Sequence, residues 1–292
     1  KKTSIVSLLP NGAAQSQKFQ TETAVENLEY SFSSAIYKLQ EEKQKKIAVL
    51  TGNGELLDLQ LYSFLSEVSK KHKLAKFTLD SVENNSIKSL QDFQQFNLAI
   101  IAKPTESFTE EEKLVLDQYI MNGGKTLWMF ENVQADTDSL YKDGKMLAYP
   151  RDLNLTDFFF SYGLRVNATL IQDLYAAKIP LATGNIGNKP QFQNLNWFYH
   201  PLVSGNPNHA ISKNIAPVRL RFANQIDTLQ NSLKKTVLLM SSMLTRKTGT
   251  PAIIELESIA IEPKEEEYSS GFQIVSLLIE GNFNSMYANR IK

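Results

Sequence analysis

The sequence predicts an α/β fold with a mostly parallel sheet and helices on both of its faces. Apolar runs of strand length alternate with amphipathic segments, the runs are almost continuously apolar, and turn or capping residues separate them. Strands buried on both faces have this apolar character, and right-handed helical crossovers join parallel strands. The predicted strands are residues 47–51, 74–79, 98–102 and 126–130, with helices at 56–68 and 87–93 and one that opens at Thr109.

The helix that opens at Thr109 has the clearest boundary signals. Thr109 and Glu112 have the spacing of a capping box, in which each side chain binds the backbone amide of the other residue. Gly123 and Gly124 follow the last apolar residues and end the helix. We therefore predict an α/β core over residues 46–150.

Residues 1–45 precede this core. Their pattern predicts a strand and a helix that pack on the core. Residues 4–9, Ser-Ile-Val-Ser-Leu-Leu, predict a short strand that stops at a Pro-Asn-Gly turn signal. Apolar residues then recur every three or four positions, which predicts an amphipathic helix over residues 23–42. The residues of this stripe, which we expect to pack on the sheet, are Val25, Leu28, Phe32, Ile36 and Leu39.

Residues 151–292 have a different pattern of predicted elements, with one short helix at 155–162 followed mainly by short strands. Gly, Asn and Pro residues predict loops at 183–190 and 204–208. This region is either an extension of the sheet or a second lobe. The predicted strands are 169–172, 218–222, 236–240, 253–256 and 273–279.

The composition is that of a globular protein, with 42% hydrophobic residues in a chain of 292. Thirty-one Lys and Arg balance 31 Asp and Glu, so the basic surplus of a nucleic-acid-binding protein is missing. The absence of cysteine excludes a thiol nucleophile and thiolate metal sites. The apolar runs are shorter than the ~20 residues that span a bilayer. Because the chain begins Lys1-Lys2-Thr3, without Met or a signal sequence, we expect it to be part of a longer protein.

Polar residues follow three of the predicted parallel strands. Asn53 and Glu55 lie in a Gly-Asn-Gly-Glu turn, Lys103 follows the next strand, and Glu131 and Asn132 follow another. The carboxyl ends of parallel strands meet in a crevice where such folds bind ligands, so these five residues are candidate ligand-binding residues. The alternative is a plain turn with Asn53 as the helix cap.

No catalytic set emerges from the sequence, and we expect neither a metal nor a cofactor. The Gly-x-Ser-x-Gly elbow of serine hydrolases is missing, which leaves only a hydrolase with an unrecognised nucleophile as an alternative. His72 ends a basic helix, and His200 and His209 do not have the spacing of a metal pair. We interpret all three histidines as surface or structural residues.

The run Trp197-Phe198-Tyr199 has two interpretations. Aromatic residues most often fill a core, but three in succession also suit an exposed platform that docks a partner protein. We take them as the candidate docking residues.

Several long segments resemble the GldG family, the auxiliary proteins of gliding-motility ABC transporters in Bacteroidetes. They include IAVLTGNGEL at 47–56, IIAKPTESFTEEEKLVLDQYIMNGGKTLWMFENVQADTDSL at 100–140 and LNLTDFFFSYGLRVNATLIQDL at 153–174. The resemblance implies the periplasmic domain of an inner-membrane protein, held by membrane anchors outside this sequence. It also implies a transporter permease and ATPase as partners, together with other periplasmic gliding-motility proteins.

The resemblance further implies a core like that of class I glutamine amidotransferases, which is a flavodoxin-like fold and is shared with an intraflagellar transport protein. Those enzymes use a cysteine nucleophile that this chain lacks, so no catalytic residue can be transferred. We therefore expect a non-catalytic domain that acts through protein–protein docking. The alternative is a periplasmic receptor that delivers a small molecule, for example a sugar, to the transporter.

Overall fold

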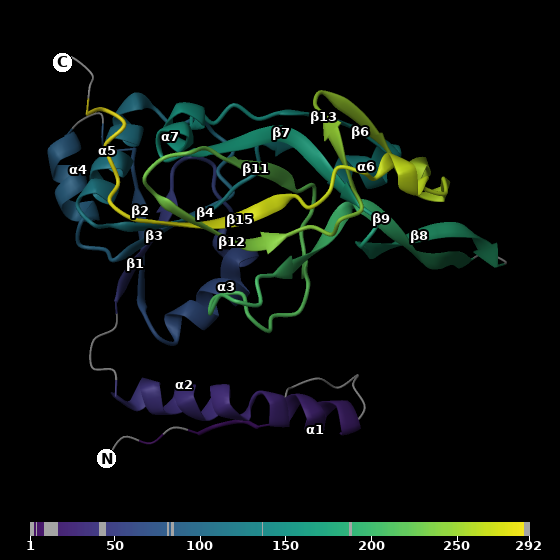
Figure 1. The fold of residues 1–292 in the computed structure, drawn as a ribbon, viewed down its shortest axis with the longest axis horizontal. Coiled ribbons are helices and arrows are strands. Elements are labelled where there is room, and N and C mark those ends of the chain that lie inside the picture. Colours follow the sequence, from purple (N-terminus) through teal and green to yellow (C-terminus); the bar gives the residue numbers. More distant parts are fainter. Residues whose placement is uncertain are drawn as a thin grey trace.

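A computed structural model describes residues 3, 5–8, 17–40, 45–80, 82, 85–135, 137–186 and 189–288. The chain has three parts: a parallel sheet with its helices, a strand-rich region beside it, and two N-terminal helices along the outside of both (Figure 1). In the parts of the chain so described, no helix has the length and apolar character needed to cross a membrane.

The parallel sheet contains the four strands that the sequence predicts. Its strands are β1 (Lys46–Thr51), β2 (Lys73–Thr78), β3 (Leu98–Ala102) and β4 (Lys125–Met129), in the order β2-β1-β3-β4. All neighbouring pairs are parallel, with Ile47 opposite both Leu74 and Leu98. The prediction of a parallel sheet is confirmed.

Helices cover both faces of this sheet, as predicted. Alternate residues of β1 point to opposite faces: Ile47 and Val49 join one core cluster, and Ala48 and Leu50 join another. Helix α3 (Asp58–Ser69) contributes to the first cluster. Helices α4 (Ser86–Phe93) and α5 (Glu110–Met121) contribute to the second.

The strand-rich region forms antiparallel sheets. One has the order β10-β9-β12-β15 with β8 paired to β9, and two others have the orders β11-β7-β13 and β14-β6-β5. The predicted strands at 169–172, 236–240 and 273–279 correspond to β7, β12 and β15. The elements are β5 (Val133–Gln134), α6 (Thr137–Asp143), β6 (Lys145–Pro150), α7 (Thr156–Ser161), β7 (Leu164–Asp173), β8 (Ala176–Ile186), β9 (Lys189–Gly205), β10 (Val218–Arg219), β11 (Asn224–Thr228), β12 (Lys234–Met240), β13 (Thr245–Gly249), β14 (Ala252–Glu255), the 3-10 helices Leu256–Ala260 and Glu265–Glu267, and β15 (Ile274–Glu280).

Strands β8 and β9 form a long hairpin that projects from one end of the molecule (Figure 1). The loop predicted at 183–190 is therefore wrong for 183–186 and 189–190, which belong to β8 and β9, while 187 and 188 lie outside the described residues. The physical reason is that pairing between the two strands satisfies the backbone hydrogen bonds of these residues, although their side chains have a weak strand propensity.

The strand-rich region shares one core with the sheet and has a second of its own. Phe158, Tyr162 and Leu233 are buried in the same cluster as α4 and α5. A separate cluster gathers residues of β6, β7, β8 and β9, among them Trp197 and Tyr199. Residues 151–292 therefore pack directly on the α4 and α5 face of the parallel sheet.

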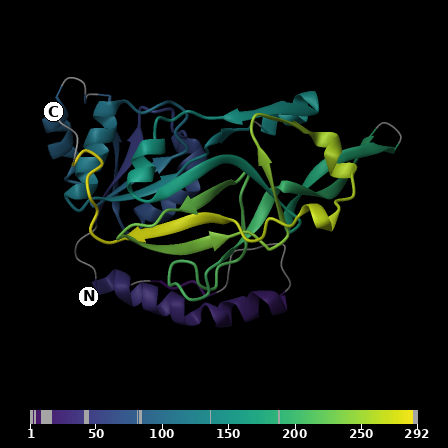
Figure 2. The ribbon, with the colours of Figure 1, turned by 45° about the horizontal axis from the view of Figure 1, so that its top comes forward.

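The N-terminal helix is α1 (Gln17–Glu26) followed by α2 (Leu28–Gln40), and it lies outside the main body (Figures 1 and 2). The predicted packing of its apolar stripe on the sheet is wrong, because none of the five residues belongs to the core clusters on the two faces of the sheet. Val25, Phe32 and Ile36 are 62%, 48% and 55% exposed, and Leu28 and Leu39 are half-buried. The spacing identified the apolar face correctly but carried no information about what covers that face. Residues 5–8 have no regular secondary structure, and positions 4 and 9 of the predicted strand lie outside the described residues.

Candidate functional site

The candidate site at the carboxyl edge of the parallel sheet is built on the turn between β1 and α3. Gly52 and Gly54 have φ angles of 122° and 70°, which glycine adopts without steric cost. The loop after β3 holds this turn, because the amides of Thr105 and Glu106 donate to the carbonyl oxygen of Asn53 at 2.9 and 3.0 Å. The turn and the loop therefore support each other.

Replacing Gly54 with alanine is expected to destabilise the protein more than replacing Gly144. Both glycines have a φ of 70°, so each alanine pays the same left-handed backbone cost of about 1–2 kcal/mol. A Cβ at Gly54 would also clash with Oγ1 of Thr105, whereas a Cβ at Gly144 meets nothing within 4 Å. Urea unfolding of both variants measures the difference. Equal losses would show that the turn is not tightly packed on the loop.

Asn53 is buried at the centre of this edge, with only 4% of its surface exposed. Its Nδ2 donates to Oε2 of Glu112 at 3.1 Å, the same oxygen that accepts the Thr109 amide at 2.8 Å in the predicted capping box. Asn53 thus links the β1 turn to the start of α5. Its Oδ1 is buried and has no hydrogen-bond partner among the described residues.

Glu55 lies against Asn53 and has a raised pKa. The amide of Asn53 donates to Oε2 of Glu55 at 2.8 Å, while Oε1 is buried without a hydrogen-bond partner in the described part of the chain. Burial raises the pKa of Glu55, and the carboxylates of Glu112 and Asp80 raise it further against the lowering effect of the backbone amides. The site can therefore accept a proton or a hydrogen-bond donor.

Replacing Glu55 with glutamine is expected to stabilise the protein at neutral pH and to have little effect near pH 4. A raised pKa in the folded state means that the wild type loses stability as the pH rises from the ordinary value of 4.5 through the folded pKa. Glutamine keeps an acceptor for the Asn53 amide and carries no charge. Urea unfolding between about pH 4 and pH 7 tests this. A difference between variant and wild type that is the same at every pH would contradict it.

Lys103 and Glu131 form a second group at the ends of β3 and β4. Their side chains make an ion pair of 3.1 Å between Nζ and Oε1, and both are partly exposed. Lys103 has a φ of 53°, a left-handed conformation that is uncommon outside glycine. Its amide donates to the Met129 carbonyl at 2.5 Å, which extends the pairing of the two strands by one residue.

Asn132 holds the sheet to the strand-rich region. Its amide donates to Oδ1 of Asn224 at 2.8 Å, and its Nδ2 donates to the carbonyl of Val166 at 2.9 Å. Both partners belong to the β7 and β11 pair. These bonds give Asn132 a structural role, whereas Asn53 and Glu55 on one strand end, and Lys103 and Glu131 on the next two, remain the candidate ligand-binding groups.

A family model described as an ABC-type uncharacterized transport system matches residues 44–292. The chain belongs to this family. It is therefore an auxiliary component of an ABC-type transport system. The match covers the parallel sheet and the strand-rich region, and it leaves out α1 and α2.

One solved structure that the comparison matches to this chain is described as the mmIFT52 N-terminal domain. The likeness has a TM-score of 0.45 at 16% sequence identity and covers 79% of this chain and 86% of that one. No curated protein matches the chain.

The prediction that Trp197, Phe198 and Tyr199 form an exposed docking platform is wrong. Trp197 and Tyr199 are buried, with 2% and 9% of their surfaces exposed, and their rings lie 5.4 Å apart. Phe198 is half-buried against Tyr268. The physical reason is the alternation of β9, which turns residues 197 and 199 to the same side, into the second core. The run does not form an exposed docking platform.

His200 is a buried structural residue, not a surface one. It is 3% exposed, its ring lies edge-on to Phe222, and neither ring nitrogen has a partner among the described residues. Burial, aided by the charges of Arg219 and Arg221, lowers its pKa to about 4, so the ring is neutral at physiological pH. Within the described ranges, no group of three or more His, Asp or Glu residues is placed to hold a metal ion.

Sequence reasoning missed two buried charges on α5. The side chain of Lys113 is fully buried and contacts Asp157 at 3.0 Å and Asn154 at 3.3 Å. Asp117 is also fully buried and accepts from the Tyr162 hydroxyl at 2.7 Å and from the Ser285 hydroxyl at 2.6 Å. Residues 113 and 117 share a helical face with the buried Leu116, and this spacing was the signal from which their burial could have been predicted.

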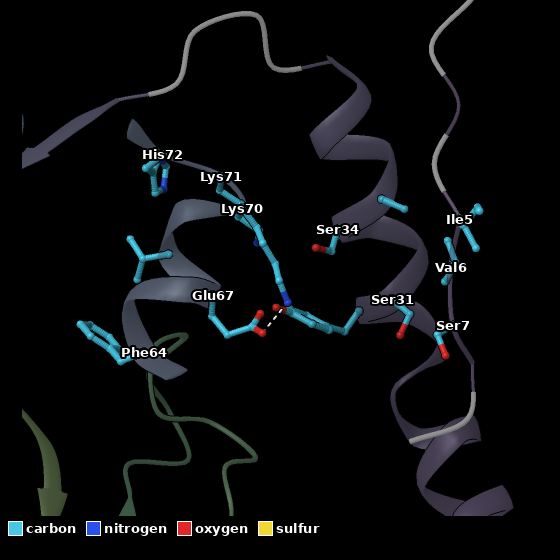
Figure 3. A pocket seen from close by; sticks show the side chains of 13 residues that line it. Ile5, Val6, Ser7, Ser31, Ser34, Phe64, Glu67, Lys70, Lys71 and His72 are labelled. Atoms are coloured by element: carbon cyan, nitrogen blue, oxygen red, sulfur yellow. Dashed lines mark hydrogen bonds and ion pairs between the residues drawn. The ribbon is translucent and has the colours of Figure 1, made fainter. Parts of the chain in front are cut away.

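An open cavity of about 530 Å³ lies between α2 and α3. Figure 3 shows Ser31 and Ser34 of α2 on one side and Phe64 and Glu67 of α3 on the other, with Glu67 paired to Lys70. A second cavity of about 650 Å³ lies at the amino edge of the sheet, around residues 94–98 and 119–125. Both cavities are away from the carboxyl edge where the candidate residues were predicted.

Proposed function

We propose that this domain is a non-catalytic subunit that docks onto other parts of an ABC transport system in gliding motility. It would be the periplasmic domain of an inner-membrane protein, with anchors outside this sequence. The observation that carries the proposal is the family match over residues 44–292, which assigns the domain to a transport system. The permease, the ATPase and other periplasmic gliding proteins are the proposed partners.

The finer identity proposed is that of a GldG protein from Bacteroidetes with a glutamine amidotransferase-like core. Its support is the resemblance of long segments such as residues 100–140. The strand order β2-β1-β3-β4 also agrees with the flavodoxin-like order 2-1-3-4-5 over its first four strands. Without cysteine the core cannot perform thiol-dependent amide hydrolysis, which agrees with a scaffolding role.

Purification of the full-length anchored protein from its native membrane tests the docking proposal. The permease and ATPase are expected to co-purify in amounts comparable to the bait. The control is an unrelated periplasmic domain carried on the same anchors. Equal recovery of the transporter with bait and control would rule out docking by this domain.

Oδ1 of Asn53 and Oε1 of Glu55 have no hydrogen-bond partner among the described residues, which favours a second candidate, a receptor for a small molecule that presents hydrogen-bond donors. A sugar hydroxyl or an amine has the required chemistry. Calorimetric titration with a panel of neutral and amino sugars tests it, with the Asn53→Ala variant as control. Absence of binding across the panel, or binding that survives Asn53→Ala, would remove this candidate.

A further inference from the structure

The N-terminal helix presents an apolar stripe to its surroundings. Val25, Phe32 and Ile36 are separated by seven and four residues, so they lie on one side of the helix, and about half or more of each is exposed. The helix continues from α1 into α2, because the Asn27 amide bonds to the Thr23 carbonyl and the Ser31 amide bonds to the Asn27 carbonyl. The three residues therefore form one stripe.

The helix meets the main body with a different face. The cavity between α2 and α3 is lined by Tyr30, Ser31, Ser34 and the buried Ala35 of α2, and also by Ile5, Val6 and Ser7. Figure 3 shows Ser34 on the side of α3 and Ser31 on the side of Ser7. At 100° per residue, the centre of the stripe lies well around the helix from Ser34 and Ser31. The side of the helix toward α3 thus carries Ser34 and Tyr30, whereas the apolar side chains of Val25, Phe32 and Ile36 are left exposed.

One flank of the apolar stripe is acidic. Glu22, Glu26 and Glu29 recur at spacings of four and three, and all three are exposed. Glu22 lies 4.0 Å from Lys18 in a pair that is exposed on both sides and contributes little. An apolar stripe with negative charges along its flank favours a partner that carries positive charges beside its own apolar face.

This rim disfavours two other occupants. If a second copy packed antiparallel through the stripe, like flanks would meet and the glutamates of both copies would repel each other. An anionic membrane surface would repel the same residues. The charge pattern instead fits an apolar helix with Lys or Arg beside its seam, as in helix-in-groove recognition.

We propose that the stripe Val25, Phe32 and Ile36, with its flank of Glu22, Glu26 and Glu29, docks an amphipathic helix with a basic flank from another subunit of the transport system. The inference rests on the proposed docking function and names its surface. Because the family match begins at residue 44, this surface lies outside the region that defines the family.

Photo-crosslinking in the native membrane tests the proposal. A photoreactive residue replaces Ile36 in the full-length anchored protein, and the crosslinked peptides are identified by mass spectrometry. The control position is Leu59 on α3, which is 86% exposed. The expected product joins residue 36 to an apolar segment flanked by Lys or Arg in another transporter subunit. Crosslinks to a second copy or to lipid, or a yield no greater than at position 59, would overturn the proposal.

Charge reversal supplies the matched control. Glu22→Lys, Glu26→Lys and Glu29→Lys together are expected to lower the crosslink yield at position 36 by about tenfold, because several rim charge pairs become repulsive. The same change at Glu262, Glu265 and Glu266, which are also exposed, is expected to leave the yield unchanged. Equal crosslink yields at position 36 in the two triple variants would contradict the proposal.

Co-purification of the permease and ATPase is measured on the same samples. If both still co-purify while residue 36 gives no specific crosslink, this surface is wrong and the docking function stands. If neither co-purifies with the unmodified protein, the docking function itself fails.

Discussion

Replacing Trp197 with alanine is expected to lower the free energy of unfolding by about 3–5 kcal/mol. The indole is 2% exposed and lies in the second core beside Tyr199, Phe222 and Ile254. Removing it takes away buried apolar surface and leaves a cavity that the surrounding strands can only partly close. Urea unfolding followed by circular dichroism measures the loss.

Phe32→Ala is the control for this prediction and should change the free energy of unfolding by no more than about 0.5 kcal/mol. Its ring is 48% exposed on the outer helix, so truncation opens no cavity in the core. Equal losses in the two variants would contradict the assignment of Trp197 to a core and Phe32 to a surface. A docking defect in a Trp197 variant would therefore report on folding, whereas a defect in Phe32→Ala would report on the surface.

The parallel half of the fold could be predicted because its signals are local. Each strand is an apolar run, and both partners of the Thr109 and Glu112 capping box are formed as the spacing predicts. Right-handed crossovers then leave few arrangements for four such strands. The hairpin of β8 and β9 could not be predicted in the same way, since its polar tip is ordered by pairing between strands and not by local propensity.

The candidate site was predicted only in part, because the sequence places residues on strand ends without stating their partners. Asn53 with Glu55 and Lys103 with Glu131 do lie at the same edge, on neighbouring strands. Asn132 is instead committed to holding β7 and β11. The strand periodicity of residues 195–203 was a usable signal that Trp197 and Tyr199 share an inward face.

The N-terminal helix shows the limit of a periodicity argument. The spacing of Val25, Phe32 and Ile36 predicts which face is apolar, but a hydrophobic face can be covered by the same chain or by another one. Exposure in the folded domain distinguishes the two cases, and here it favours a partner. The acidic flank of Glu22, Glu26 and Glu29 then restricts the partner to one that carries basic residues beside its own apolar face.

Replacing Asp117 with alanine is expected to lower the free energy of unfolding by about 3–5 kcal/mol, because three donors lose their acceptor at about 1–3 kcal/mol each, and not through lost apolar contacts. The carboxylate is fully buried and accepts from the Tyr162 hydroxyl, the Ser285 hydroxyl and the Met286 amide at 2.7, 2.6 and 3.0 Å. Alanine leaves these donors in an interior where an unmade hydrogen bond is costly. Since Ser285 and Met286 follow β15, residues 283–288 are also expected to gain faster amide exchange with solvent.

Two variants separate this network from other causes of instability. Tyr162→Phe removes one of the hydrogen bonds to Asp117 and is expected to cost about 1 kcal/mol, because the ring stays packed against Phe158 and Phe283. Asp92→Ala removes an exposed carboxylate from α4 and is expected to stay within about 0.5 kcal/mol of wild type. Urea unfolding and hydrogen exchange of all three variants decide the matter. If Asp117→Ala cost no more than Tyr162→Phe and left exchange at 283–288 unchanged, Asp117 would not be what holds the C-terminal segment to α5.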